Sequence, residues 1–350
     1  MRRIEGRAGF PVVIPSPGCV RALLILAALS GGCQTVPSPP SSIDVLVPQI
    51  LEQDHIPSAV IVAGDVDHVR YARAFGDARL DTIYDLASCT KVVATTTAIL
   101  KLMEEGKLAL DDPIGKYLKP FEGRHITIRD CLHHASGLPA YLTPRARTSD
   151  GILAEIAGLR VGSGYCYSCL NFVSLARLVE NVTKTTFADY LQAAVFGPMG
   201  MRDTGFAPPA SRCAPTGPDL KGVVHDPLAR TYASAEHQSG NAGLFSTGAD
   251  LARFCQALLQ GKILKPETVA MMFEPDENSR GLGWDVFHDP PYWPGVGHTG
   301  FTGTLVWMEP ATGRFAILLT NRVLTGEQTT VSRLRKEVLA ALNTRASHGQ

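Results

Sequence analysis

The sequence lacks an excess of charge of either sign: 33 lysines and arginines balance 33 aspartates and glutamates over 350 residues. It also lacks a block rich in lysine and arginine, which argues against nucleic acid as a partner. No apolar run reaches the roughly 18 residues that a membrane span needs, and no internal repeat is visible. With 45% hydrophobic residues, the chain can form one large globular domain, or two closely packed ones, with an ample core.

The sequence also lacks the cysteine pattern of a metal site. Of eight cysteines, two lie in the N-terminal segment and six in the remainder. Cys89, Cys131 and Cys255 fall among apolar residues of predicted helices, where we expect buried free thiols, although an oxidising compartment would permit disulfides. Cys166 and Cys169 form a CxxC pair, but partner ligands for zinc are missing at a suitable spacing. We therefore expect no metal and no cofactor.

The first 33 residues are typical of an export signal. The basic stretch MRRIEGR precedes ALLILAALSGGC, whose apolar core has the roughly 7–15 residues of a signal-peptide core. Small residues before Cys33 resemble a bacterial lipobox, in which Cys33 would be lipidated, but Leu29 stands one place further from the cysteine than that pattern prefers. We expect an exported lipoprotein of the periplasm or outer membrane, which contacts the membrane only through its lipid anchor. Ordinary secretion and a structural core helix are the alternatives.

The remaining chain has strand patterns at both ends and helical spacing between them. Residues 34–45, with QTVPSPPSS, predict a partly polyproline tether to a domain over 46–345. The stretches SAVIVAG and HVRYARAFGDA predict an early hairpin, and GLGWDVF, TGTLVWMEP and GRFAILLTNRV predict late strands. Helical spacing covers 88–105, ended by Gly106, and much of the middle of the chain, while QTTVSRLRKEVLAALNT predicts a final helix.

This order of elements predicts an α/β (α+β) fold. Strands from the two termini would form one antiparallel sheet flanked by helices, with a mostly helical subdomain of about 95–230 inserted. Clefts form where such parts meet, and the start of the 88–105 helix would lie at that junction.

The tetrapeptide SCTK opens the 88–105 helix. On a helix, residues three apart lie side by side, so the Ser88 hydroxyl and the Lys91 amine can meet. The first turn also offers unpaired N–H groups and a dipole that favour developing negative charge. This arrangement can make a serine nucleophilic. By itself, however, Ser88 could equally be an ordinary N-cap and Lys91 an exposed helix lysine.

Two further stretches belong with SCTK. GYCYSCLNF holds Tyr167 between a glycine turn and a helix start, and in GHTGFTGT the residues His298, Thr299 and Gly300 lead into a strand. Taken singly, Tyr167 could be a core tyrosine with its hydroxyl hydrogen-bonded, and His298 a surface or structural histidine.

In the order Ser-x-x-Lys, Tyr-x-(Asn), (Lys/His)-Thr-Gly, the chain resembles the serine β-lactamase and penicillin-binding-protein superfamily, in its class C and related esterase branch. Supporting stretches are ITIRDCLHHASGLP, FGPMGMRDTGF, GNAGLFSTGADLARF, GLGW and LLTNR. The resemblance covers about residues 50 to 325. It implies a β-lactamase/transpeptidase-like fold and acyl transfer through a serine.

The resemblance also implies roles for individual residues. Ser88 would be the nucleophile, with Lys91 on the same helical face, and Tyr167 would take and return the proton, as a phenolate or through Lys91. The backbone N–H groups of Ser88 and Phe301 would form the oxyanion hole.

On the strand side, His298 and Thr299, together with Gly300, would line the cleft and hold a substrate carboxylate or ester carbonyl.

Two positions depart from the family pattern. Cys169 occupies the place usually held by an asparagine that hydrogen-bonds a substrate amide, and a thiol is a weak partner for that purpose. His298 stands where β-lactamases of this class have a lysine, and a histidine is mostly uncharged at neutral pH. Both changes weaken recognition of penicillin-like or D-Ala-D-Ala ligands, so ester hydrolysis is favoured.

Other polar residues receive structural interpretations. His133 and His134 are adjacent and would point in different directions on a helix, which argues against a shared metal. Asp226 could shape the edge of the cleft or a structural turn. Ser246 or Thr247 would cap the next helix, so no chemistry is assigned to GNAGLFST.

The sequence therefore predicts a cell-envelope serine hydrolase that acts through an acyl-enzyme on Ser88. Its partner would be a small-molecule ester, amide or muropeptide substrate. A carboxylesterase comes first, then a D-Ala-D-Ala carboxypeptidase of peptidoglycan metabolism, then a β-lactamase. The alternative from another class is a catalytically weak muropeptide-binding protein.

Overall fold

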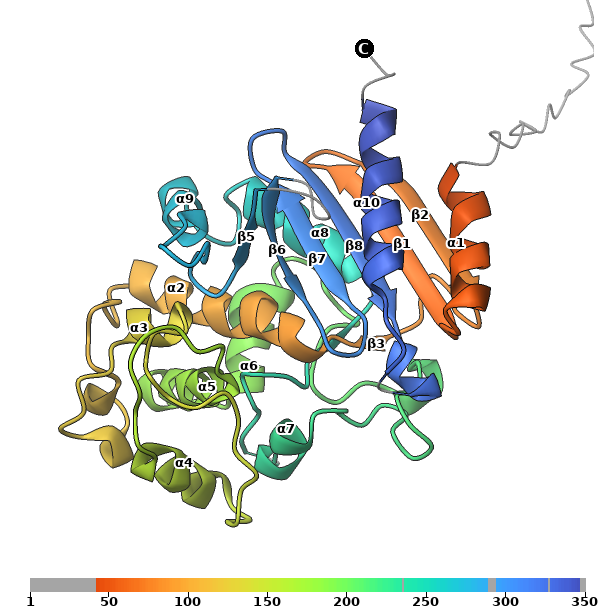
Figure 1. Cartoon of the computed structure of the whole chain (residues 1–350). Coiled ribbons are helices and arrows are strands. Elements are labelled where there is room, and N and C mark those ends of the chain that lie inside the picture. Colours follow the sequence, from red (N-terminus) through yellow and green to blue (C-terminus); the bar gives the residue numbers. More distant parts are fainter. Residues whose placement is uncertain (1–41, 235, 289–293, 327, 347–350) are drawn as a thin grey trace, which may run out of the picture. The chain divides into compact units, whose positions relative to one another are not determined.

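The computed structural model describes residues 42–346, except 235, 289–293 and 327 (Figure 1). The predicted export signal, Cys33 and residues 34–41 of the tether lie outside the described residues. Everything below concerns the unit that begins at Pro40. Within the described part, no helix is both long and apolar enough to cross a membrane.

Helix α1 (Ser42–Gln53) begins inside the segment predicted as a tether. Residues 42–45 therefore belong to the folded part, and the predicted boundary at 46 is wrong. Ile43, Val47 and Ile50 are fully buried at helical spacing. Burial of this apolar face stabilises the helix, although the residues just before it are rich in proline. Pro48 lies within the helix and obscures its pattern in the sequence.

A six-stranded sheet joins the two ends of the chain, as predicted. Its order is β2-β1-β8-β7-β6-β5, and every neighbouring pair is antiparallel. The early strand β1 pairs with the late strand β8, with Ala59 opposite Thr320. The strands are β1 (Ser58–Asp65), β2 (Val69–Gly76), β5 (Asp285–Phe287), β6 (Gly295–Thr299), β7 (Leu305–Glu309) and β8 (Arg314–Thr320).

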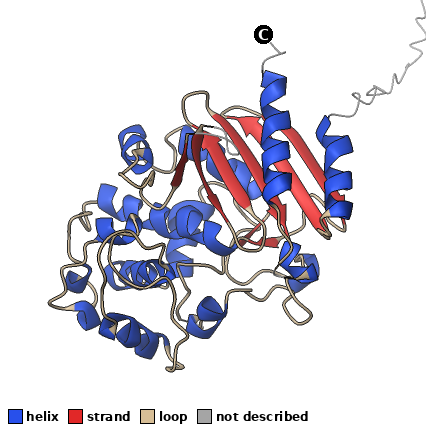
Figure 2. Cartoon of the chain, in the orientation of Figure 1, coloured by secondary structure: helices blue, strands red, loops and turns tan. Residues whose placement is uncertain are grey.

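Both faces of this sheet are covered by helices (Figure 2). Successive side chains of a strand point to opposite faces, so Ile61 packs with α1 and α10 (Ser332–Ala346), while Val60 and Val62 pack on the other side. Helix α8 (Gly248–Leu259) covers that second face. Burial of each such aliphatic side chain contributes about 1.5–3 kcal/mol.

Helices and loops occupy most of the chain between β2 and β5 (Figure 1). A two-stranded sheet, β3 (Tyr84–Asp85) with β4 (Phe245–Ser246), links the start and end of this region. Side-chain N-caps fix the starts of several helices, including Thr127, Ser168 and Asp226. The remaining helices are α2 (Thr97–Glu104), α3 (Ile128–Leu132), α4 (Ser149–Gly158), α5 (Cys169–Thr183), α6 (Phe187–Leu191), α7 (Pro227–Tyr232) and α9 (Pro266–Phe273).

Three local predictions differ from the structure. The helix predicted over 88–105 consists of a 3-10 turn (Ala87–Cys89), a π-helical turn (Lys91–Thr96) and α2; Gly106, at φ +69°, follows its end as predicted. In GLGWDVF only Asp285–Phe287 forms a strand. His298 and Thr299 end strand β6, which was not predicted because GVGHT has few β-branched residues.

Candidate active site

The backbone before Ser88 is held in an unusual conformation. Ala87 has a positive φ of 45°, which is rare for a residue with a side chain and is common at functional sites. The buried carboxylate of Asp85 accepts hydrogen bonds from the backbone N–H of Ala87 at 2.8 Å and of His225 at 2.7 Å. Burial raises the pKa of Asp85 to about 6, although these hydrogen bonds oppose the shift. Asp85 thus ties the Ser88 segment to the loop before α7.

The turn between β6 and β7 packs tightly against the same segment. A Cβ atom on Gly300 would lie 2.0 Å from Thr304 Oγ1 and 2.5 Å from the carbonyl oxygen of Leu86, so only glycine fits. Thr304 Oγ1 donates to that Leu86 carbonyl at 2.9 Å, and Thr302 Oγ1 donates to the Asp85 carbonyl at 2.7 Å. These contacts bring strand residues 298–301 next to Ser88.

Lys91 is fully buried, and its ammonium group has three partners. Nζ donates to Ser88 Oγ at 3.0 Å, to the backbone carbonyl of Asn241 at 2.9 Å and to Cys169 Sγ at 3.6 Å. Burial lowers the pKa of Lys91, but the negative charge available on Cys169 and Tyr167 outweighs it, and the pKa is raised. Lys91 therefore remains positively charged and lowers the energetic cost of ionising Ser88.

Tyr167 lies beside this lysine, just before the N-cap of α5. The centre of its half-buried ring is 5.1 Å from Lys91 Nζ and 5.3 Å from the guanidinium carbon of Arg280. The imidazole of His134 stacks on the ring at a centroid distance of 4.4 Å. The structure thus brings Ser88, Lys91 and Tyr167 together from segments far apart in the sequence.

Two cavities of about 500 Å³ each open beside Ser88. The first, here called the α7 cavity, is lined by Tyr141, His225, Asp226 and Arg230. The second, the C-terminal cavity, is lined by Thr299, Gly300, Arg322 and Arg335. Ser88 and Phe301 line both cavities, so a substrate can extend to either side of the serine.

Phe301 marks the boundary between the two cavities. Its side chain is 49% exposed, and its ring faces His225 at 5.8 Å and Arg322 at 4.7 Å. Among the described residues, no backbone hydrogen bond outside the helices and strands uses the N–H groups of Ser88 and Phe301. Both donors are therefore available to a substrate oxygen.

Comparison with known proteins agrees with this geometry. A family model described as Beta-lactamase matches residues 43–340. The chain belongs to the beta-lactamase family. It is a serine hydrolase of that family, and the resemblance, the fold class and the enzyme class predicted from the motifs are confirmed.

Individual relatives of this beta-lactamase family member carry different names. A protein of Escherichia coli (strain K12) named “Putative D-alanyl-D-alanine carboxypeptidase” is 31% identical over 300 residues, which cover 69% of each chain. The octameric penicillin-binding protein homologue from Pyrococcus abyssi has a TM-score of 0.71 at 21% identity, covering 86% of this chain and 77% of its own. EstCE1, a hydrolase with promiscuous acyltransferase activity, has a TM-score of 0.69 at 22% identity, covering 83% and 95%. The two structures share the fold.

His298 is buried at the end of strand β6. Its side chain is only 2% exposed and is absent from the lining of both cavities, which Thr299 and Gly300 do reach. Nδ1 lies 2.7 Å from the Thr299 carbonyl, and Nε2 is buried without a hydrogen-bond partner among the described residues. Burial, together with the positive charges of Lys91 and Arg280, holds the pKa of His298 well below its usual value. The ring of His298 nevertheless lies 6.1 Å from that of Tyr167, so its predicted part in holding the substrate stays a prediction.

Two residues near the reaction site were missed by sequence reasoning. Asn241 acts through its backbone carbonyl, which accepts from Lys91, and the residue type gives no sign of a backbone contact. Arg280 is 9% exposed and lies over the rings of Tyr165 and Tyr167. The residues around Arg280 in the sequence contain no motif that predicts its position at the site.

The remaining polar residues have the structural roles expected of them. Thr247 caps α8, and Asp226 caps α7 while also lining the α7 cavity. His133 lies 3.5 Å from Asp276, whereas His134 faces Tyr167, so the two histidines do point apart. Cys89, Cys131 and Cys255 are buried free thiols, and the half-buried Cys166 and Cys169 are also free.

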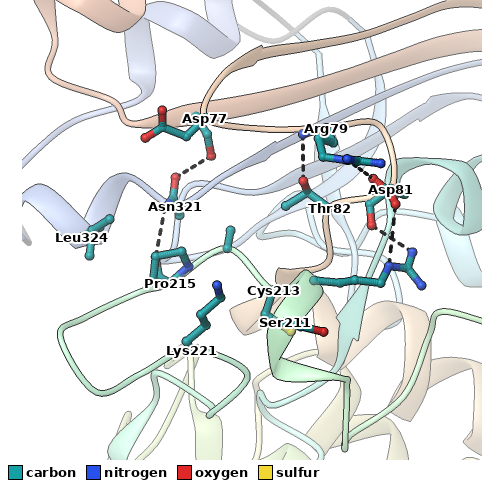
Figure 3. A pocket seen from close by; sticks show the side chains of 13 residues that line it. Asp77, Arg79, Asp81, Thr82, Ser211, Cys213, Pro215, Lys221, Asn321 and Leu324 are labelled. Atoms are coloured by element: carbon teal, nitrogen blue, oxygen red, sulfur yellow. Dashed lines mark hydrogen bonds and ion pairs between the residues drawn. The ribbon is translucent and has the colours of Figure 1, made fainter.

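A third cavity, of about 590 Å³, lies beside the start of β1 (Figure 3). Its arginines are paired, Arg79 with Asp81 and Arg212 with Asp203. None of the residues predicted as catalytic lines it.

In the described part of the chain, one group of side chains could hold a metal. It consists of Asp65, Asp67 and His68 in the β1–β2 turn. Asp65 is already paired with Arg70 at 2.7 Å, so nothing at this turn indicates an ion.

Proposed function

We propose that this protein is a cell-envelope hydrolase that cleaves esters or small amides through an acyl-enzyme on Ser88. The observation that carries the proposal is the 3.0 Å contact between Lys91 Nζ and Ser88 Oγ, at a point where two cavities meet. A serine in an ordinary N-cap would instead accept a backbone N–H, whereas Ser88 lies inside the turn Ala87–Cys89, whose N-cap position is Leu86, and its hydroxyl accepts from Lys91.

The reaction begins with attack of Ser88 Oγ on the substrate carbonyl carbon. The serine proton passes to the Tyr167 oxygen, since Lys91 already carries its own proton. Lys91 and Arg280 lie near the ring of Tyr167, which places two positive charges beside the proposed proton acceptor. The carbonyl oxygen becomes an oxyanion, and the N–H groups of Ser88 and Phe301 are the available donors.

Collapse of this intermediate breaks the bond to the leaving group, which takes the proton back from Tyr167. Water then attacks the acyl-enzyme, giving its proton to Tyr167 and releasing the acid. Ser88 regains a proton from Tyr167, so the cycle consumes one water and one ester or amide.

Two features favour esters as substrates. Cys169 Sγ is engaged by Lys91 at 3.6 Å, and a thiol is a weak hydrogen-bond partner for a substrate amide. The buried, neutral His298 cannot supply the fixed positive charge that a lysine would bring to the cleft. Ester carbonyls need neither interaction and are more reactive than amides.

A D-Ala-D-Ala carboxypeptidase is the second candidate. The name of the Escherichia coli relative, at 31% identity over 69% of both chains, supports it and agrees with a place in the cell envelope. The proposed place in the cell envelope includes export directed by residues 1–33 and lipidation at Cys33. Release of D-alanine from a muropeptide, measured alongside ester hydrolysis, would rank the two candidates.

Hydrolysis of p-nitrophenyl butyrate tests the proposal. We expect turnover by the parent protein and a loss of about 1,000-fold or more in Ser88→Ala, with an unchanged circular dichroism spectrum. Ser174→Ala is the matched control, because among the described residues this buried serine hydroxyl bonds only the Leu170 carbonyl of its own helix. If Ser88→Ala retains the parent rate, the nucleophile is wrong.

A further inference from the structure

His134 follows His133, the C-cap of α3, and its side chain is fully buried. Its φ of +59° is the left-handed conformation common just after a helix, where the N–H of Ala135 donates to the Asp130 carbonyl at 2.8 Å. This helix end sets the direction in which the chain leaves α3. Helix α3 packs against α5 (Figure 1), and Tyr167 immediately precedes Ser168, the N-cap of α5.

Three contacts of His134 enclose Tyr167. The His134 carbonyl accepts from the backbone N–H of Cys166 at 2.9 Å, and its Nδ1 accepts from the backbone N–H of Ser168 at 2.9 Å. Between these two anchors, the imidazole stacks on the Tyr167 ring with an interplanar angle of 28°. One residue therefore fixes the main chain on both sides of Tyr167 and one face of its ring.

His134 contributes geometry and no charge. Its Nδ1 is an acceptor and so carries no proton, and Nε2 is buried without a hydrogen-bond partner in the described part of the chain. Burial, followed by the charges of Arg280 and Lys91, holds the pKa of His134 well below its usual value. A neutral ring can stack on Tyr167 without adding a third positive charge to the site.

We propose that His134 is a positioning residue for the reaction, which holds the Tyr167 hydroxyl in the orientation that exchanges a proton with Ser88. The proposal rests on the proposed function of Tyr167. Its physical basis is that a proton transfer requires a narrow range of distance and direction, and a half-buried tyrosine can otherwise rotate away. No chemical step passes through His134 itself.

A double-mutant cycle with Tyr167→Phe tests this role. His134→Asn retains a side-chain acceptor and tolerates the left-handed conformation but removes the stacked ring. We expect it to lower kcat for p-nitrophenyl butyrate by about 30-fold, with KM within twofold of the parent, because His134 itself lines neither cavity. In the Tyr167→Phe background the same substitution should lower kcat by less than about threefold, because there is no hydroxyl left to position.

Two further variants complete the experiment. His134→Phe keeps the ring and loses the acceptor for the Ser168 N–H, and we expect an intermediate loss of kcat. His133→Asn is the matched control, since His133 lies beside Asp276 and not beside Tyr167, and we expect this variant to keep the parent kcat within about twofold.

The outcomes separate the two proposals. An equal loss of kcat in both backgrounds, an unchanged kcat in His134→Asn, or a rise in KM alone would overturn the role of His134. Failure of both His134 variants to fold would also overturn it, and would assign the residue to the core. Activity in Ser88→Ala would instead overturn the proposed function.

Discussion

The two sides of the cleft are built differently. On the helix side, which holds Ser88 and Lys91, the buried ammonium group has three partners and points at the serine. On the strand side, residues 298–301, the buried His298 leaves Nε2 without a hydrogen-bond partner among the described residues, and Phe301 is half-exposed. The helix side therefore has the contacts that the proposed acyl transfer requires, whereas the strand side lacks the positive charge that a lysine at position 298 would supply.

This difference separates reactivity from recognition. The groups that would activate Ser88 are fixed by burial, by a strained Ala87 and by the tight approach of Gly300. The cations that line the C-terminal cavity on the strand side are instead Arg322 and Arg335. Changes on the helix side should abolish reaction with all substrates, and changes on the strand side should alter which substrates react.

The largest expected effect is on the helix side. Lys91→Met should lower kcat/KM for p-nitrophenyl butyrate by about 1,000-fold, because the positive charge beside Ser88 is lost. The fold should survive, since methionine fills a similar buried volume without the cost of burying a charge. Lys101→Met, on helix α2, should keep the parent activity; equal losses in both variants would contradict a special role for Lys91.

Gly300→Ala tests how the two sides are joined. The new Cβ would meet Thr304 Oγ1 and the Leu86 carbonyl, so we expect a loss of about 3 kcal/mol in the free energy of unfolding and a reduced kcat. Gly158→Ala, in helix α4 with open space around its Cβ position, should instead stabilise the protein by about 0.5–1 kcal/mol. Urea denaturation measures both, and a neutral Gly300→Ala would show that the close approach is not required.

Cys169→Asn should change recognition more than reactivity. An asparagine amide can bond a substrate amide, so acylation by benzylpenicillin should become about tenfold faster, while ester hydrolysis stays within about threefold of the parent. Stopped-flow acylation and steady-state hydrolysis measure the two rates. A parallel fall in both would place Cys169 with the reactive groups of the helix side.

The smallest effect is expected for His298→Gln, whose activity should stay within about threefold of the parent because the side chain lines neither cavity.

The pH dependence of the free energy of unfolding should differ more clearly between His298→Gln and the parent. Since the pKa of folded His298 is lowered, only the unfolded chain takes up this proton below about pH 6.5, which reduces stability by about 1.4 kcal/mol per pH unit.

Removing His298 removes that part of the loss. As pH falls below 6.5, the free energy of unfolding should therefore decrease less in His298→Gln than in the parent. Buried Asp85, whose pKa is raised, acts in the opposite sense but equally in both proteins, so the difference between them is unaffected. A constant difference across this pH range would show that His298 titrates normally.

Much of the fold and site could be predicted because the signals are local. Alternating apolar residues gave the hairpin and the late strands, and SCTK gave the Ser88–Lys91 contact through helical spacing. Strand β6 was missed because its glycines are stabilised by pairing with β7 and not by their own preference. Asn241 and Arg280 contact residues that are distant in the sequence, so local patterns do not reveal these contacts. The burial of His298 depends on tertiary packing, which the residue type does not specify.

The most direct measurement is mass spectrometry of the protein after reaction with a fluorophosphonate probe. An activated serine should take up one probe molecule, and peptide mapping should place it on the peptide that contains Ser88. Ser88→Ala should remain unlabelled while Ser174→Ala labels like the parent. Absence of labelling in the folded parent, or a label on another peptide, would contradict the claim that Ser88 is the nucleophile.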